Sequence, residues 1–593
     1  MRILFNSKKL EYKTPFGCLV PKQECTLHIA IPGTVKASAV RLCLYEENGS
    51  EKESFSFAFD RTDGPYDIWK CVFSLAEAGL YFYRFSITGH TGTFRLFKQG
   101  DDTNMEDGDM WQISCVPKDF FVPDWAKGAV IYQVFPDRFA RAGCTDLSGK
   151  LKPYSVHGNW DEEVAWQPNE NGEVLNNDFF GGNFRGITEK MDYIASLGVE
   201  ILYLNPICMA FSSHRYDTAD YLRPDPMLGT QEDFFNLCKA AHDRGIRVVL
   251  DGVYSHTGSN SVYFDKKNIF GGGAYSDPES PYREWYQFKE YPDKYESWWG
   301  FDTLPTLNKN EPTLREFICR VLEHWLSLGA DGFRLDVADE LPDDFIKMLK
   351  DRLRAICPDA LLMGEVWEDA SNKIAYDVRR RYFVDAELDS VMNYPFRTAI
   401  LDFLWQRDGG EAFRERVMTI LENYPRQVVL CNMNMLGTHD TPRILTALVD
   451  DFDADRAALA QRKLDRAQLA KGKQLLRLAS VLQYALPGCP SLYYGDEAMM
   501  EGGKDPFNRR TYPWNREDAE LLAHFRKLGN LRKRSKALKL GDTEFLCAGG
   551  GKLAFVRRFE KEEIKIYVNR SEADWVLKNG KTVAPMGWLF EED

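Results

Sequence analysis

The sequence predicts an α/β protein built on a (β/α)8 TIM barrel, with a loop domain inserted after the third strand, an N-terminal β-sandwich and a small C-terminal antiparallel β domain. Three observations predict it. Short alternating strands fill the first 115 or so residues. Apolar strands then alternate with amphipathic helices, a pattern typical of parallel strands. From about residue 530 the helical pattern stops and strands return.

These changes of pattern set the expected domain boundaries. A chain of 593 residues is too long for one hydrophobic core. We expect a binding or dimerisation domain at 1–120, the catalytic barrel at 121–530 and the C-terminal domain at 531–593. Within the barrel, residues 257–303 are expected to form the inserted domain, because they are rich in Gly, Tyr and Trp and fill the longest gap between strands.

The N-terminal domain is predicted from alternating segments with turns between them. Its clearest strands are expected at 25–31, 40–45 and 80–85. Strands that alternate in this way pack one face inward, as in a β-sandwich. No chemistry is visible in this part of the sequence.

The barrel is predicted from strands and helices that follow one another. Its expected strands are 130–135, 201–204, 246–251, 332–336, 360–365, 433–439 and 490–494. Apolar residues at helical spacing mark the helices between them: Ile187, Met191, Ile194 and Leu197 before Gly198; Phe234, Cys238 and Ala241 before Gly245; and Leu314, Ile318, Leu322 and Trp325. About eight such strands suit a barrel with insertions. Residues 545–547, 553–558 and 564–568 are the expected C-terminal strands.

Composition excludes several classes of partner. The net charge of −14 argues against nucleic acid or an anionic membrane as the main partner. The chain contains 14 Trp, 27 Tyr and 38 Phe, which suit a large core and also a surface that binds sugars. No apolar run is long enough for a signal peptide or a membrane span. The 13 cysteines are scattered and lack a CxxC pair, so we expect reduced thiols in a cytoplasmic protein.

Acidic residues stand at the ends of several predicted strands. Asp251, Asp336 and Glu365 end three of them, and Asp440 ends a fourth segment. In a parallel barrel these ends meet on one face. Arg334 lies two residues before Asp336, so both side chains point the same way, and the arginine would keep the aspartate ionised. One ionised carboxylate beside a protonated one is the arrangement that glycoside hydrolysis requires.

Other interpretations of these residues stay open. Taken alone, Arg334 and Asp336 are equally consistent with a surface ion pair. Several carboxylates could also form a site for a hard metal ion, although Arg334 argues against a cation there. His214, His256 and His439 follow strand ends and are expected to donate hydrogen bonds to a polyhydroxy ligand. They lack the close spacing common in zinc sites.

Taken together, these segments match a known set of motifs. The motifs are Val199–Pro206, Asp251–His256, Gly332–Asp336, Gly364–Trp367 and Gly437–Asp440. In this order they resemble the α-amylase family of retaining α-glucoside hydrolases, glycoside hydrolase family 13, over residues 125–593. Residues 304–308, together with the N-terminal β domain, resemble the neopullulanase, cyclomaltodextrinase and maltogenic amylase branch.

The resemblance implies three catalytic residues. Asp336 would be the nucleophile that forms a glucosyl–enzyme intermediate. Glu365 would be the general acid and then the base. Asp440 would hold sugar hydroxyls and stabilise the oxocarbenium-like transition state. Asp251 would support this network. Asp339 and Glu340 lie past the strand end and would shape the leaving-group side or start the next helix.

The resemblance also implies substrate contacts. The residues concerned are His214, Tyr216, His256, Arg334, Trp367, His439, Asp505 and Arg509. Tyr216 would stack under the sugar that is cleaved, and Trp367 would meet the leaving-group side. Asp505 and Arg509, four residues apart, would bind the next sugar.

Two departures from the family bear on metal binding. Ser255 stands where many members have an asparagine that ligates calcium, and residues 137–144 lack the Asn/Asp-rich calcium pattern. We therefore predict no cofactor and no required metal, with calcium as the alternative.

The expected function is hydrolysis of α-1,4-glucosidic bonds in maltooligosaccharides, and also in cyclodextrins or pullulan, by double displacement. A transglycosylase acting on α-glucans is an alternative, because it would use the same residues. A catalytically inactive glucan-binding subunit is a third hypothesis, disfavoured because Asp336, Glu365 and Asp440 are all present. The branch also implies a homodimer through the N-terminal domain.

Overall fold

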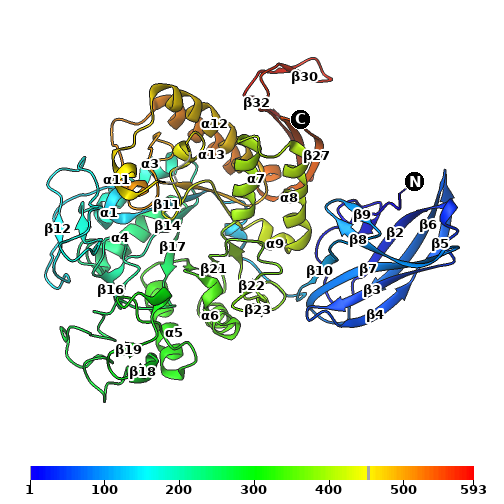
Figure 1. The fold of residues 1–593 in the computed structure, drawn as a ribbon. Helices are drawn as coiled ribbons and strands as arrows, with labels where there is room; N and C mark the ends of the chain where they lie inside the picture. The colour runs from blue at the N-terminus through cyan, green and yellow to red at the C-terminus, as the bar shows by residue number, and fades with distance from the viewer. Residues whose placement is uncertain (1, 451–453, 593) are drawn as a thin grey trace. The chain divides into compact units, whose positions relative to one another are not determined.

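The computed structural model describes residues 2–450 and 454–592 (Figure 1). Its contacts divide the chain into two compact units. The first comprises Met1–Phe121, Glu368–Asp389 and Glu411–Val429, and the second Val122–Trp367, Ser390–Gly410 and Leu430–Asp593. The division into three domains expected from the sequence stays a prediction.

The first unit contains two antiparallel sheets. One has the order β1-β2-β6-β5: Lys13–Thr14, Glu24–Pro32, Tyr66–Ser74 and Ala58–Asp63. The other has the order β4-β3-β7-β8-β9, with β10 paired to β7: Glu51–Ser56, Ala39–Glu46, Gly79–Gly89, Gly92–Gln99, Asp102–Asn104 and Trp111–Cys115. The unit also holds the hairpin β22 (Ile374–Ala375) and β23 (Val378–Arg379), the helix α9 (Arg426–Val429) and, except for Gly410, the helix α8 (Gly410–Asn423).

Alternation along the strands builds the core of this unit. In β3, Val40, Leu42 and Leu44 are buried while Arg41 is exposed. Because successive side chains point to opposite faces, one face of each sheet supplies the apolar core. The N-terminal antiparallel fold predicted from this pattern is confirmed.

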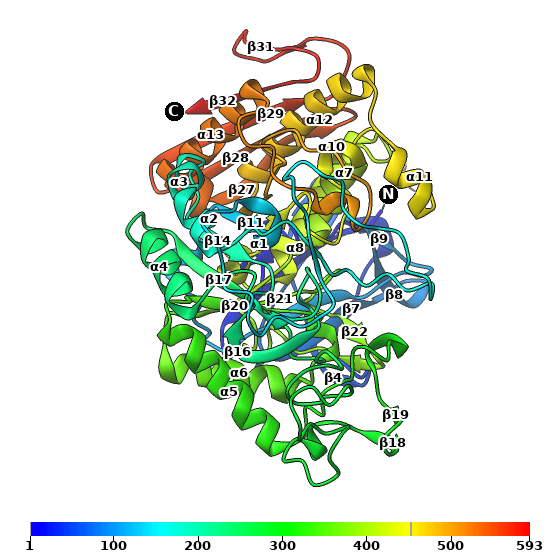
Figure 2. The same ribbon diagram turned by 90° about the vertical axis from the view of Figure 1, so that its left-hand side faces the viewer.

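The second unit is built on an eight-stranded parallel sheet, β24-β21-β20-β17-β14-β11-β26-β25. The strands in that order are Ser390–Val391, Leu361–Gly364, Gly332–Leu335, Arg247–Gly252, Ile201–Leu204, Ile131–Val134, Cys489–Tyr493 and Met433–Met435. Figure 2 shows β14, β17, β20 and β21 side by side. A parallel bridge between Met392 and Met433 links the two ends of the sheet, so it forms a nearly closed barrel. The predicted fold class is confirmed.

One barrel strand was missed by the sequence analysis. β24 has two residues, Ser390 and Val391, and shows no apolar run that could distinguish it from a loop. The other strands are recognisable because they are buried on both faces and are mostly apolar throughout.

Helices and short strands fill the connections of the barrel. The helices of this unit are α1 (Pro136–Phe139), α2 (Phe184–Glu189), α3 (Met191–Ser196), α4 (Gln231–His242), α5 (Pro312–Ser327), α6 (Asp343–Ile356), α7 (Tyr394–Leu404), α10 (Ile444–Ala447), α11 (Arg456–Gln461), α12 (Arg466–Ala485), α13 (Ala519–Arg534) and α14 (Lys536–Leu540). The short strands are β12 (Ser155–Val156), β13 (Asp178–Phe179), β15 (Cys208–Ala210), β16 (Thr218–Pro224), β18 (Phe288–Glu290) and β19 (Lys294–Tyr295). Of these, β18 and β19 lie in the inserted segment 257–303.

The helices confirm the predicted faces and differ from them in two places. Of the apolar residues at helical spacing before Gly198, Ile187 lies in α2, Met191 and Ile194 lie in α3, and Leu197 follows α3; the two helices are separate because Lys190 between them leaves helical geometry at ψ 7°. Helical structure also continues beyond residue 530, to Leu540. There Ser535 caps α14 by accepting a hydrogen bond from the Leu538 N–H at 3.0 Å, which starts a new helix directly after α13.

A C-terminal antiparallel sheet follows these helices, in the order β27-β28-β29-β32. Its strands are Asp542–Gly549, Lys552–Phe559, Glu562–Asn569 and Gly587–Glu592, and a separate pair is β30 (Trp575–Val576) with β31 (Thr582–Val583). Across residues 2–450 and 454–592, no helix has the length and apolar character needed to cross a membrane. The thirteen cysteines, all in the described residues, are free thiols.

Candidate active site

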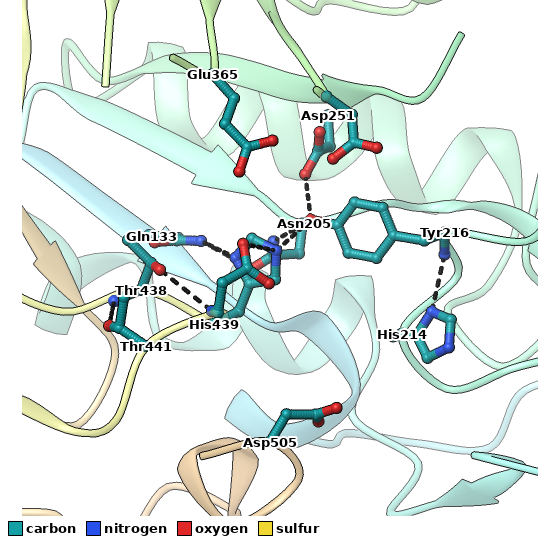
Figure 3. A network of polar contacts seen from close by, with 12 residues as sticks. Gln133, Asn205, His214, Tyr216, Asp251, Glu365, Thr438, His439, Thr441 and Asp505 are labelled. Carbon is teal, nitrogen blue, oxygen red and sulfur yellow. Dashed lines mark hydrogen bonds and ion pairs between the residues drawn. The ribbon is translucent and has the colours of Figure 1, made fainter. Parts of the chain in front are cut away.

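The acidic residues predicted at strand ends do meet on one face of the barrel. Asp251 lies near the end of β17, Asp336 directly follows β20, and Glu365 directly follows β21. These three strands are parallel neighbours in register, so their carboxyl ends coincide. In Figure 3, Glu365 and Asp251 lie on one side of the site and Asp505 on the other, with Tyr216 and His439 between them.

Arg334 is the centre of the carboxylate cluster. Its Nη1 donates to Asp251 Oδ1 at 2.6 Å and to Asp336 Oδ1 at 2.8 Å. Its Nη2 lies 2.8 Å from Glu365 Oε2. The guanidinium is fully buried, so its charge acts on all three carboxylates without screening by water. Arg334 and Asp336 therefore point to the same side, as their two-residue spacing on the strand requires.

The expected effect of Arg334 on the charge of Asp336 is not the dominant one. Burial raises the pKa of Asp336 well above its usual value, and the neighbouring carboxylates Glu365, Asp251 and Asp440 raise it further, whereas Arg334 lowers it. Arg334 therefore acts in the predicted direction, and the prediction that it keeps Asp336 ionised stays a prediction. Burial and the neighbouring carboxylates thus oppose ionisation of Asp336, and Arg334 favours it.

Asp440 completes the cluster from the loop after β25. Its Oδ2 lies 3.1 Å from His439 Nε2, and its Oδ1 lies 3.5 Å from Arg509 Nη2. Asp440 keeps 30% of its side chain exposed, and partial desolvation in the site, followed by the charge of Glu365, raises its pKa to about 7. The structure therefore stabilises the neutral form of Asp440, whereas the role expected for this residue requires its negative charge.

This raised pKa predicts a pH-dependent gain in stability for Asp440→Asn. A carboxyl group whose pKa is higher in the folded than in the unfolded chain lowers stability progressively as pH rises from about 4 to about 7. The variant should match the wild type near pH 4 and melt a few degrees higher above pH 7, about 1–3 °C. Calorimetry at pH 4.5, 6 and 8 measures this difference.

Asp505→Asn is the matched control for the lost contact with Arg509, because Asp505 is a second, more exposed carboxylate bound to that arginine. A melting temperature of Asp440→Asn below that of the wild type at pH 8 would contradict the raised pKa of Asp440.

A directed chain of hydrogen bonds orients Tyr216 and His439. The Gln133 amide donates to His439 Nδ1 at 2.9 Å, which places the ring proton on Nε2. That Nε2 lies against the Tyr216 hydroxyl oxygen, which also accepts from Asn205 at 3.1 Å. Tyr216 in turn donates to Asp251 Oδ2 at 2.8 Å. The two rings are parallel within 7°, so the tyrosine is held in one orientation.

The three predicted histidines lie in the site as neutral groups. Burial lowers the pKa of His256 to about 3, lowers that of His439 well below its usual value, and also lowers that of His214. His256 contacts Ser255 Oγ at 2.7 Å and the Tyr216 carbonyl oxygen at 3.1 Å, and His214 Nδ1 accepts from the Tyr216 N–H at 3.1 Å. All three are therefore fixed around Tyr216.

The backbone after Asp336 positions Glu365. The Val337 N–H donates to Glu365 Oε2 at 2.9 Å. Val337 has φ +40°, a left-handed conformation that a β-branched residue rarely adopts. Trp367 Nε1 donates to Glu365 Oε1 at 3.1 Å, so both oxygens of this carboxyl group are held.

Aromatic and charged residues extend the site on two sides. The Trp367 ring stacks on Tyr394 with the centroids 4.0 Å apart, and 46% of Trp367 is exposed. On the opposite side, Arg509 Nη1 pairs with Asp505 Oδ1 at 2.8 Å, as their spacing of four residues allows. The structure thus brings together all of the predicted site residues.

Two residues of the network, Gln133 and Asn205, were absent from the predicted site. Gln133 is a polar residue inside the buried apolar strand β11, and Asn205 directly follows β14. A polar side chain within an apolar strand, and a polar residue at a strand end, are signals that could have identified both.

The described residues contain no cluster of three or more His, Cys, Asp or Glu arranged to hold a metal ion. In the loop after β11, Asp137 Oδ2 accepts from Arg138 Nε at 2.7 Å and from the Phe180 N–H at 3.0 Å, and its Oδ1 accepts from the Gly181 N–H at 3.1 Å. Both oxygens of this carboxylate are therefore engaged by the protein itself.

The sequence matches a family model described as "Alpha amylase, catalytic domain" over residues 133–530. The chain is 38% identical over 553 residues to an amylopullulanase of Thermoanaerobacter thermohydrosulfuricus, which covers 84% of this chain and 36% of that protein. It is 34% identical to a cyclomaltodextrinase of Geobacillus thermopakistaniensis, with 76% of this chain and 70% of that protein covered.

The fold is similar to that of solved structures. The type III pullulan hydrolase from Thermococcus kodakarensis superposes with a TM-score of 0.70 at 26% identity, and all of both chains is covered. The chain spans 33–48% of the length of the three amylopullulanases that it matches.

Proposed function

The chain belongs to the alpha-amylase family, as its motifs predict, and we propose that it is a retaining glycoside hydrolase that cleaves α-1,4-glucosidic bonds of maltooligosaccharides. The observation that supports this proposal is that Asp336 and Glu365 both contact the guanidinium of Arg334. Shared contact with one side chain favours the short carboxyl spacing, about 5–5.5 Å, of retaining enzymes.

In the first step, Asp336 attacks the anomeric carbon as the bond to the leaving oxygen breaks. Glu365 gives its proton to that oxygen, so the leaving chain departs as an alcohol and a β-glucosyl ester remains on Asp336. The Val337 N–H and the Trp367 indole N–H hold the carboxyl group of Glu365 that makes this transfer.

In the second step, Glu365 accepts a proton from water, and the water oxygen attacks the anomeric carbon from the face opposite to Asp336. The ester bond breaks and the product leaves as the α anomer. Two inversions at one carbon give net retention.

The remaining residues stabilise the positive charge that develops on the sugar ring. Asp440 would accept hydrogen bonds from two sugar hydroxyls. These hydrogen bonds would strengthen as the sugar ring flattens toward the transition state. Tyr216, fixed by Asp251 and His439, would stack under the same ring. Trp367 lies against Glu365 and would meet the leaving-group sugar, and Asp505 with Arg509 would bind the next unit on the other side.

The function is tested by following products from maltotetraose. Proton NMR during the first minutes should show the α anomer before mutarotation, because double displacement retains configuration. Initial β product would contradict the mechanism, and no cleavage at all would favour the inactive glucan-binding hypothesis.

The same time course on γ-cyclodextrin and pullulan sets the substrate range suggested by the names of the relatives. Products longer than the substrate would support the transglycosylase alternative, which uses the same catalytic residues. The cytoplasmic location and the homodimer through residues 1–120 stay predictions.

A further inference from the structure

An exposed tryptophan in the inserted segment stands apart from the residues described so far. Trp299 leaves 75% of its surface exposed, the largest fraction among the exposed large hydrophobic residues of the described chain. Exposing a large ring to water is unfavourable, so packing does not explain a tryptophan at this position.

The backbone at this position is also unfavourable for tryptophan. Trp299 has φ +51° and ψ 25°, the left-handed conformation in which glycine is preferred. Gly300 is the next residue along the chain, so the segment could place glycine here at less cost. Both the exposure and the conformation oppose folding, and such costs cluster at functional positions.

The ring is nevertheless held in place. Trp299 Nε1 donates to Glu340 Oε1 at 2.8 Å. Its ring lies 5.9 Å from that of Trp298, which in turn lies 5.2 Å from the ring of His256. Aromatic rings therefore continue from a histidine of the candidate site to an exposed, oriented indole.

The contact with Glu340 places Trp299 next to the leaving-group side. Glu340 ends the short helix Ala338–Glu340 that follows Asp336. The same loop begins at Val337, whose N–H donates to Glu365, the proposed proton donor to the leaving oxygen. The loop of residues 337–340 thus connects the general acid to the indole.

A positive charge lies close to Glu340, the residue that holds the Trp299 ring. Lys309 Nζ makes a long hydrogen bond of 3.5 Å to the Ser255 carbonyl, and burial lowers the pKa of Lys309 to about 8 while Glu340 opposes that shift. An ammonium has three donors, so Lys309 adds hydrogen-bond donors beside Glu340.

We propose that Trp299 is a stacking platform for a glucosyl unit on the leaving-group side of the α-glucan, which makes it a residue that selects longer chains. A ring fixed in advance loses little freedom when a sugar binds, so its full contact area contributes to affinity. The proposal rests on the proposed hydrolase function and adds one substrate contact outside the catalytic residues.

The test measures maltohexaose binding by calorimetry in an Asp336→Asn background. Addition of Trp299→Ala should weaken binding about five- to tenfold, the effect expected for one aromatic contact. In the otherwise native enzyme, the same substitution should lower kcat/KM for maltohexaose at least fivefold more than kcat/KM for α-maltosyl fluoride, whose leaving group carries no sugar. A smaller loss, or equal loss for both substrates, would overturn the proposal.

Two further variants separate binding from folding. Trp299→Gly removes the ring and relieves the left-handed strain, so it should weaken binding equally while the melting temperature stays level or rises. Tyr291→Ala removes another partly exposed ring of the inserted segment and should leave the affinity within twofold. Failure of the hydrolase proposal itself would appear separately, as absence of maltotetraose cleavage by the wild type.

Discussion

Replacement of Asp336 by asparagine is expected to lower kcat for maltotetraose by about 10⁴–10⁶-fold. The amide cannot form the glucosyl ester, so the first step loses its nucleophile. The fold should persist, because Asn has the shape of Asp and because burial already disfavours the charge of Asp336. Reducing-sugar release over hours, together with calorimetric melting, measures both effects.

Asp339→Asn is the matched control for this variant. Asp339 lies three residues further along, in the short helix Ala338–Glu340, and is not assigned a catalytic role. It should retain turnover within an order of magnitude. Turnover of Asp336→Asn within tenfold of the wild type would mean that another carboxylate is the nucleophile.

Replacement of Glu365 by glutamine is expected to lower kcat for maltotetraose by about 10²–10⁴-fold, the usual size of a general acid's contribution. Gln keeps a side chain of the same length beside Arg334, Val337 and Trp367 but gives no proton to the leaving oxygen. The loss in kcat/KM should be much smaller for α-maltosyl fluoride, because kcat/KM reports the first step and fluoride leaves without protonation. Comparison of kcat/KM for the two substrates measures the difference.

Azide distinguishes the roles of the two carboxyl groups. With Glu365→Ala and α-maltosyl fluoride, azide should attack the ester on Asp336 and give α-maltosyl azide after two inversions. With Asp336→Ala, azide should attack the substrate directly and give the β-azide after one. NMR identifies the anomer, and the opposite pattern would exchange the two assignments.

Much of the fold could be predicted because parallel barrel strands are apolar on both faces. β14 and β20 coincide with predicted segments to within a residue at each end. β24 could not be predicted, because two residues carry no periodicity and the strand exists only through pairing with β21. The continuation of helix to Leu540 was missed for a similar reason, since one capping serine starts a new helix where the apolar pattern had weakened.

The site was predicted where its residues follow one another along the chain, and missed where distant segments supply them. Gln133 orients His439 across 306 positions of sequence, a partnership that no local spacing reveals. The same limit applies to Asp336, because its neighbour Arg334 is visible in the sequence whereas its burial and the charge of Asp440, which raise its pKa, are not.

The sequence by itself determined most of the barrel strands, the acids at their ends and the common direction of Arg334 and Asp336. These features depend on covalent geometry, which alternates side chains along any strand. Only the tertiary structure decided how many carboxylates share one guanidinium, how deeply Asp336 and Glu365 are buried, and that Trp299 is bonded to Glu340 next to the catalytic loop. Burial and long-range contact arise from packing of the whole barrel, and they set the electrostatics on which the proposed chemistry depends.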